Sequence, residues 1–189
     1  MGCVGFFTYR WYSNMQTERA HAALAHAIEI FDRAQQKSDQ VLWQEAGLAF
    51  EQGAQQYAHS SLAPYFIAFQ SEVALQQGHL EKARELMAQV VDKIQKDSPF
   101  YHAYVIKYAR MNSDASQPEL VEQGMQELNR ETLDVQNLNR DMALYYQGLI
   151  PFEQGDRVAA KKIWDLLIKD YAQDSLWAQR AQAKLDYMA

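Results

Sequence analysis

The chain has 189 residues, of which 48% are hydrophobic, with 8 glycines and 4 prolines. This length supports one sizeable core and is short for two ordinary domains, so a single domain is expected. The formal charge of −6 and the scattered basic residues exclude a typical nucleic-acid partner, because phosphate binding depends on clustered Lys and Arg. The single cysteine, Cys3, excludes an intrachain disulfide and a cysteine-rich metal site.

The N-terminal segment, residues 1–14, is crowded with aromatic and apolar residues up to Ser13. It supplies about half of the roughly 20 apolar residues that a membrane span needs. Aromatic side chains beside Arg10 suit the interface between membrane and water. Two interpretations are open: a remnant of an N-terminal membrane anchor, or a turn that packs on the core.

Amphipathic helices are predicted along the rest of the chain, because apolar residues recur there at steps of three and four. No strand-like alternation of any length is present. Polar and proline-containing breaks separate the helices. The expected helices cover about 15–36, 40–57, 62–77, 80–96, 100–111, 119–129, 140–154, 157–171 and 174–187.

Two glycine turns share one pattern: Gly78 is followed five residues later by Ala83, and Gly155 by Ala160. Glycine takes the left-handed conformation that ends a helix, and the alanine lets the returning helix pack closely. Helical hairpins at a nearly constant period build a solenoid. The predicted fold is therefore all-α, a right-handed superhelix of about four antiparallel helix pairs plus a C-terminal capping helix.

Small residues recur at nearly the same period at Ser71 and Gly148, and Ala109 is the small residue of the middle hairpin that best fits between them. Each is expected where the two helices of a pair approach most closely, so bulk there should separate the pair.

These glycine turns resemble tetratricopeptide repeats, although Ile67 and Leu144 stand where the repeat usually has tryptophan, and the period is longer than the usual one of about 34 residues. Almost the whole chain resembles, more specifically, the tetratricopeptide-like YfgM family. The resembling runs are Tyr9-Arg10-Trp11-Tyr12, Ser61-Leu62-Ala63-Pro64-Tyr65, Gly78-His79-Leu80-Glu81-Lys82-Ala83-Arg84, Gln147-Gly148, and Gln154-Gly155-Asp156-Arg157-Val158-Ala159-Ala160-Lys161-Lys162-Ile163-Trp164.

The YfgM family is the ancillary subunit of the bacterial SecYEG translocon, with a short cytosolic tail, one membrane helix and a periplasmic repeat domain. The resemblance implies that residues 15–189 form a single periplasmic repeat domain and that residues 1–14 belong to an N-terminal anchor. It also implies partners among translocon subunits, periplasmic chaperones and exported chains. The chain departs from the family in its missing anchor and in the long middle turn at residues 112–118.

Residues suited to catalysis or to metal binding form no recognisable constellation. His21 and His26 are five residues apart, so on a helix they diverge by about 140° instead of sharing a face as a zinc pair would. No glycine-rich phosphate loop, nucleophile elbow or paired Cys–His arrangement occurs. The sequence therefore predicts no catalytic residues, no metal and no cofactor.

A partner-binding groove is predicted from the repeat register, which turns five residues toward the concave side: Tyr65, Glu72, Arg110, Tyr145 and Phe152. Aromatic residues interleaved with charges suit capture of a peptide or a partner helix. The alternative is that these side chains fill gaps between the first helices of neighbouring pairs.

The leading functional hypothesis is a membrane-tethered, periplasmic, non-catalytic scaffold that binds export machinery or chaperones. A cytosolic repeat adaptor, whose aromatic N-terminus packs on the first hairpin, is the first alternative. A second alternative is an assembly protein that dimerises through the stripe of Leu24, Ile28 and Phe31. The sequence leaves open the partner's identity, the peptide preference of the groove and the oligomeric state.

Overall fold

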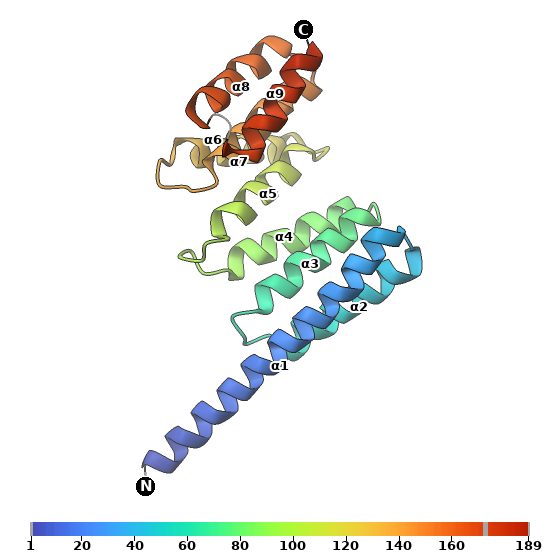
Figure 1. Ribbon diagram of the computed structural model, residues 1–189, viewed down its shortest axis with the longest axis vertical. Coiled ribbons are helices and arrows are strands. Elements are labelled where there is room, and N and C mark those ends of the chain that lie inside the picture. Colours follow the sequence, from blue (N-terminus) through green and yellow to red (C-terminus); the bar gives the residue numbers. More distant parts are fainter. Residues whose placement is uncertain (1, 172–173, 189) are drawn as a thin grey trace. The chain divides into compact units, whose positions relative to one another are not determined.

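The computed structural model describes residues 2–171 and 174–188, and for residues 2–14 and 188 it describes the backbone alone. Every regular element in these residues is helical, which confirms the all-α class (Figure 1). The α-helices are α1 (Gly2–Lys37), α2 (Gln40–Gln56), α3 (Ala63–Gln76), α4 (Leu80–Lys93), α5 (Tyr101–Ser113), α6 (Pro118–Leu133), α7 (Arg140–Glu153), α8 (Arg157–Tyr171) and α9 (Leu176–Met188).

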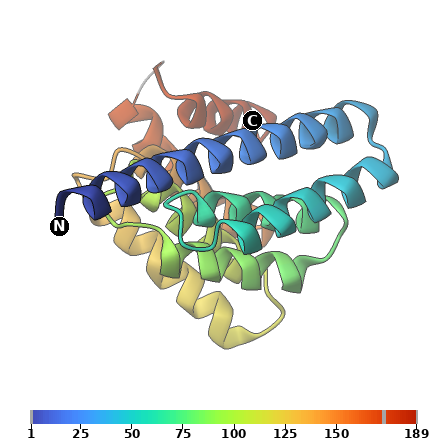
Figure 2. The ribbon, with the colours of Figure 1, turned by 90° about the horizontal axis from the view of Figure 1, so that it is seen from below.

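Helices that are neighbours in the chain pack as consecutive pairs, α1 with α2, α3 with α4, α5 with α6 and α7 with α8. Figure 2 shows that α1 and α2 run antiparallel. The C-terminal helix α9 packs on both α7 and α8. The chain divides into two compact units, Met1–Ile94 with α1–α4 and Gln95–Ala189 with α5–α9. Consecutive helix pairs of this kind are the packing pattern of a helical-repeat protein.

The backbone of residues 2–14 is part of α1 and is helical, where one interpretation expected a turn. This part of α1 extends beyond the other helices of its unit (Figure 1). The side chains of residues 1–14 lie outside the described part of the chain, so the anchor interpretation remains a prediction. No helix in the described residues combines the length and the apolar character needed to cross a membrane.

Both predicted glycine turns are confirmed by backbone geometry. Gly78 has φ 78° and Gly155 has φ 87°, values in the left-handed region that glycine reaches without a steric penalty. The following N–H groups close the turns: that of His79 donates to the carbonyl of Ala74 at 2.8 Å, and the equivalent bond in the second turn has the same length. Three of the last four carbonyls of each helix therefore accept hydrogen bonds from the turn.

The three small residues lie where paired helices come closest, as predicted. Ser71 is fully buried and donates its hydroxyl to a backbone carbonyl of α4 at 2.7 Å. A Cβ atom on Gly124 of α6 would lie 2.4 Å from the carbonyl oxygen of Ala109. A Cβ atom on Gly148 would lie 2.4 Å from Nε1 of Trp164 on α8. Bulk at any of these contacts has to push two helices apart.

The apolar stripe of α1, one hypothesis for which was dimerisation, packs against the core of the first unit. Leu24, Ile28 and Phe31 pack, partly buried, against the buried side chains of α1, α2 and α3. The Phe31 ring stands edge-on to that of Trp43 at 5.2 Å between centroids. Folding of this unit alone thus accounts for the stripe.

A buried polar cluster holds the connection between α6 and α7. Glu131 is 7% exposed, and its Oε2 lies 2.9 Å from Nδ1 of His102 on α5. The amide of Asn137 donates to the same oxygen at 2.7 Å and to the Glu131 carbonyl at 3.1 Å. One carboxylate therefore links α5, α6 and the loop before α7.

This cluster predicts a pH dependence of stability. Burial raises the pKa of the Glu131 carboxyl above its ordinary value, against the lowering effect of the hydrogen bond and charge of His102, while Glu127 and Asp134 raise it further. When the folded-state pKa exceeds the unfolded one, the folded state binds more protons, so stability falls as pH rises between the two pKa values. We therefore expect the difference in free energy of unfolding between the wild type and Glu131→Gln to change in favour of the variant as pH rises from the unfolded-state to the folded-state pKa of Glu131.

The measurement is chemical denaturation of both proteins at several pH values from about pH 4 to 7, the range that brackets a raised carboxyl pKa. Glu122→Gln, an exposed change of the same type on α6, is the matched control. An advantage of the wild type that grows with pH through the window would contradict the predicted sign.

Candidate partner-binding site

An open pocket of about 610 Å³ lies between α7 and α9 in the second unit. Its α9 wall consists of residues at spacings of three and four, which place them on one face of the helix. Its α7 wall consists of two aromatic residues seven positions apart. The lining residues of this α7–α9 pocket are Tyr145, Phe152, Arg180, Ala183, Lys184 and Tyr187.

Trp164 of α8 packs against the two aromatic residues that form the α7 wall of the pocket. Its side chain is fully buried, and its ring centroid lies 6.1 Å from that of Tyr145 and 5.3 Å from that of Phe152. Its Nε1–H donates to the carbonyl oxygen of Tyr145 at 3.1 Å. The two pocket aromatics are therefore fixed by packing before any partner binds.

Two cations on α9 give the pocket its charge. The guanidinium of Arg180 lies 4.8 Å from the ring centroid of Trp177, and the ammonium of Lys184 lies 5.2 Å from that of Phe152. Such cation–π contacts contribute about 0.5–1 kcal/mol at exposed sites and orient the side chains. Neither cation has a carboxylate partner in the described part of the chain. Their charges are thus available to an anionic partner.

Tyr145 adds a hydrogen-bond donor to the pocket. Burial raises the pKa of its hydroxyl, and the charge of Glu153 raises it further, whereas Arg180 and Arg110 lower it. The net shift is upward, so the hydroxyl is protonated at neutral pH. It has no hydrogen-bond partner in the residues that the structure describes. The hydroxyl can therefore donate to a bound acceptor.

Two of the five predicted groove residues line this pocket. Tyr145 and Phe152 line it directly. Arg110 of α5 does not line it; its guanidinium pairs with Glu153 at the end of α7 at 2.7 Å and also with Asp114. This side chain joins the two helices beside the pocket, and its charge acts on the Tyr145 hydroxyl.

The other two predicted residues, Tyr65 and Glu72, lie in the first unit. Both are on α3, seven residues apart and half-buried, and both have interaction partners. A single groove formed by all five residues therefore remains a prediction.

The sequence interpretation missed the α9 wall of the pocket. Residues 174–187 were expected to form a C-terminal capping helix whose apolar stripe, Trp177, Ala181 and Leu185, covers the core. The signal was present in the spacing of Arg180, Lys184 and Tyr187, which puts two cations and an aromatic ring on the side next to that stripe. Tyr187 is 81% exposed, as expected for a residue at the rim of a binding surface.

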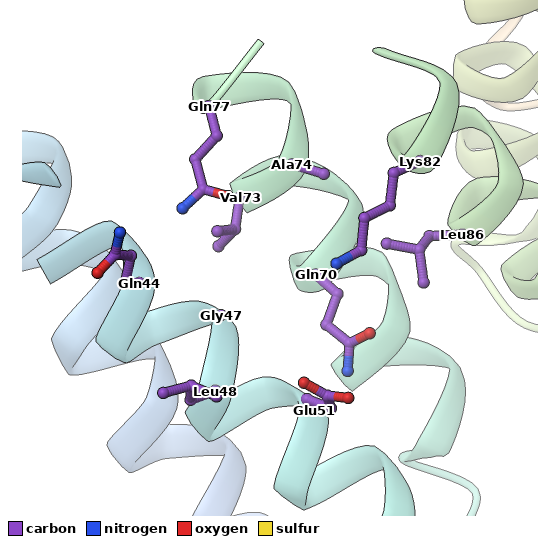
Figure 3. A pocket seen from close by; sticks show the side chains of 10 residues that line it. All are labelled: Gln44, Gly47, Leu48, Glu51, Gln70, Val73, Ala74, Gln77, Lys82 and Leu86. Carbon is purple, nitrogen blue, oxygen red and sulfur yellow. The ribbon is translucent and has the colours of Figure 1, made fainter. Parts of the chain in front are cut away.

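A second open groove, of about 500 Å³, crosses the first unit and was not predicted (Figure 3). Helices α2 and α3 each present polar side chains at its ends and small or apolar ones between them, and α4 adds a third wall. Figure 3 shows Gln44 and Gln77 toward one end, and Glu51 and Gln70 toward the other. The lining residues of this α2–α4 groove are Gln44, Gly47, Leu48, Glu51, Gln70, Val73, Ala74, Gln77, Lys82 and Leu86.

The α2–α4 groove offers hydrogen-bonding groups to a partner. The side-chain amides of Gln44, Gln70 and Gln77 form no hydrogen bonds within the described residues, and each carries donors and an acceptor. The lining also includes two charged side chains, Glu51 and Lys82.

Metal ligands do not gather among the described side chains, 15–171 and 174–187: no group of three or more His, Cys, Asp or Glu residues there could hold an ion.

Comparison with known proteins finds no matching family model and no significant match among curated proteins. Among solved structures, a chain described as "DHF119 filament" is 16% identical, with 90% of this chain and 93% of that chain covered and a TM-score of 0.35. A chain described as "DHF79 filament" is 14% identical, with 88% and 97% covered and a TM-score of 0.30. Scores at this level say nothing about function.

Proposed function

We propose that this protein is a non-catalytic protein–protein interaction scaffold that holds a partner in the α7–α9 pocket. One observation carries the proposal: Tyr145 and Phe152, two of the residues selected from the repeat register, line one open pocket together with the two cations Arg180 and Lys184. Aromatic and arginine side chains over a rigid support are the typical content of an interface hot spot.

The proposed setting is the bacterial inner membrane, with both helical units in the periplasm and residues 1–14 belonging to the anchor. In this setting the protein assists protein export or periplasmic chaperones, and its partners are translocon subunits, chaperones or exported chains. The support for this part is the resemblance to the YfgM family in the glycine turns and the aromatic N-terminus.

The test is photo-crosslinking in the full-length protein in its own cells, with a photoreactive phenylalanine at Phe152 and, separately, at Tyr187. Val158 is the matched control, because it is 82% exposed on α8 of the same unit and does not line the pocket. We expect adducts with export or chaperone proteins from the two pocket positions and none of these from Val158.

The other outcomes separate the alternatives. Adducts with cytosolic proteins would support the cytosolic adaptor. Adducts with a second copy of the chain would support the assembly protein. Well-expressed protein that yields no adduct at either pocket position would contradict the pocket as the partner-binding surface.

A further inference from the structure

We propose that the α7–α9 pocket takes an extended acidic segment of a partner polypeptide, in which an apolar residue stands between two acidic ones. Its carboxylates face Arg180 and Lys184, and its apolar side chain contacts Tyr145 and Phe152. This inference rests on the proposed function and names the chemistry of the partner.

The charge distribution favours an acidic occupant at this place. The chain as a whole carries a formal charge of −6. The third cation near the pocket, Arg110, is neutralised by Glu153 and Asp114. Arg180 and Lys184 have no such partners in the described residues and therefore form a positive patch on an acidic protein. An acidic segment is attracted here and repelled by most of the remaining surface.

The spacing of the two cations matches an extended chain. Arg180 and Lys184 are four residues apart on α9, which places their Cβ atoms about 5–6 Å apart. In an extended chain, side chains of alternate residues point to the same side and are separated by about 6.5–7 Å along it. Carboxylates at positions i and i+2 of a bound segment can therefore each reach one cation.

The same alternation points the intervening residue to the opposite wall. A segment that lies between the helices, with residues i and i+2 facing α9, directs residue i+1 toward α7. There Tyr145 and Phe152 present aromatic surface that is held in place by Trp164. An apolar side chain fits this position, and the Tyr145 hydroxyl can donate to a carbonyl or carboxylate of the segment.

The experiment measures fluorescence anisotropy of labelled synthetic peptides with the full chain. The probe has Asp-Phe-Asp at the centre of a Gly/Ser background, an acetylated N-terminus and an amidated C-terminus. Two matched probes carry Lys-Phe-Lys or Asp-Gly-Asp. We expect saturable binding of the first probe, at least about tenfold weaker binding of the other two, and an affinity that falls as salt is added.

Paired variants locate the binding. The double variant Arg180→Gln with Lys184→Gln is expected to lower the affinity for the Asp-Phe-Asp probe about tenfold, since two partly exposed ion pairs are lost. Lys162→Gln with Lys169→Gln is the control, because it removes the same charge from exposed positions of α8 outside the pocket. We expect the control to change the affinity less than about twofold. Far-UV circular dichroism checks that both variants keep the helical fold.

Several results would overturn the inference. These are equal binding of the basic probe, equal loss of affinity in the control variant, or binding only when a probe has a free C-terminal carboxylate. Self-association of the chain that blocks the probe and is abolished by the pocket variant would instead make a second copy the occupant.

Failure of the inference can be distinguished from failure of the proposed function. If Phe152 and Tyr187 capture partners in cells while the acidic probe does not bind, the scaffold function stands and the acidic chemistry is wrong. If neither experiment gives a signal, both the pocket's role and its chemistry are wrong.

Discussion

Gly124→Ala is expected to lower the free energy of unfolding by about 3 kcal/mol, the upper part of the usual range for overpacking. The added Cβ would lie 2.4 Å from the carbonyl oxygen of Ala109 and 2.7 Å from the backbone N of Ser113. Both are backbone atoms of α5, so no side-chain rotation relieves the clash and α5 and α6 have to separate. The gain of about 0.5–1 kcal/mol that alanine brings to a helix interior is smaller than this cost.

Gly47→Ala is the matched control, because it makes the same change inside α2. Its Cβ would lie 3.4 Å from Cγ1 of Val73, which is ordinary van der Waals contact. We therefore expect the free energy of unfolding to rise by about 0.5–1 kcal/mol, because alanine has the higher helix propensity. Denaturant unfolding followed by far-UV circular dichroism measures both variants. Unchanged stability in Gly124→Ala would show that α5 and α6 do not approach as closely as the structure indicates.

Trp164→Ala is the second change with a large expected effect, a loss of about 3–5 kcal/mol. The side chain is fully buried, so truncation leaves a cavity lined by Tyr145, Phe152 and its other neighbours. It also removes the indole N–H that donates to the Tyr145 carbonyl at 3.1 Å. Because the two pocket aromatics lose their support, binding of the acidic probe should weaken together with stability.

Trp164→Phe separates packing from the hydrogen bond. Phenylalanine keeps an aromatic ring and loses the N–H donor, so we expect a smaller loss of about 1–2 kcal/mol. Thermal and denaturant unfolding of the two variants provide the comparison. Equal losses in Trp164→Ala and Trp164→Phe would mean that the ring contributes little packing energy, contrary to its complete burial.

Features specified by near neighbours in the chain were predictable. The turns at Gly78 and Gly155 require a left-handed residue, which the sequence supplies at both places. The bounds of α7, Arg140–Glu153, differ by one residue from the expectation, because a local apolar period and a following glycine define that helix.

The middle turn shows where local patterns mislead. Residues 112–118 are rich in turn-forming types, yet Asn112 and Ser113 belong to α5. Asn112 is buried, and the Ser113 hydroxyl donates to the carbonyl of Ala109 at 2.9 Å. The Ser113 hydroxyl finds its partner within the helix and so no longer favours a turn. Burial of Asn112 carries a cost, because its Oδ1 has no hydrogen-bond partner in the described residues.

The sequence alone determined the helical class, the glycine turns and the small residues at helix contacts, because each follows from a short period or from the conformation of one residue. The tertiary structure alone decided that α9 packs on α7, bringing Arg180 and Lys184 to Tyr145 and Phe152. It alone also placed His102, Glu131 and Asn137 around one carboxylate. These contacts join distant residues through helix packing, whose angle and depth depend on the whole set of buried side chains.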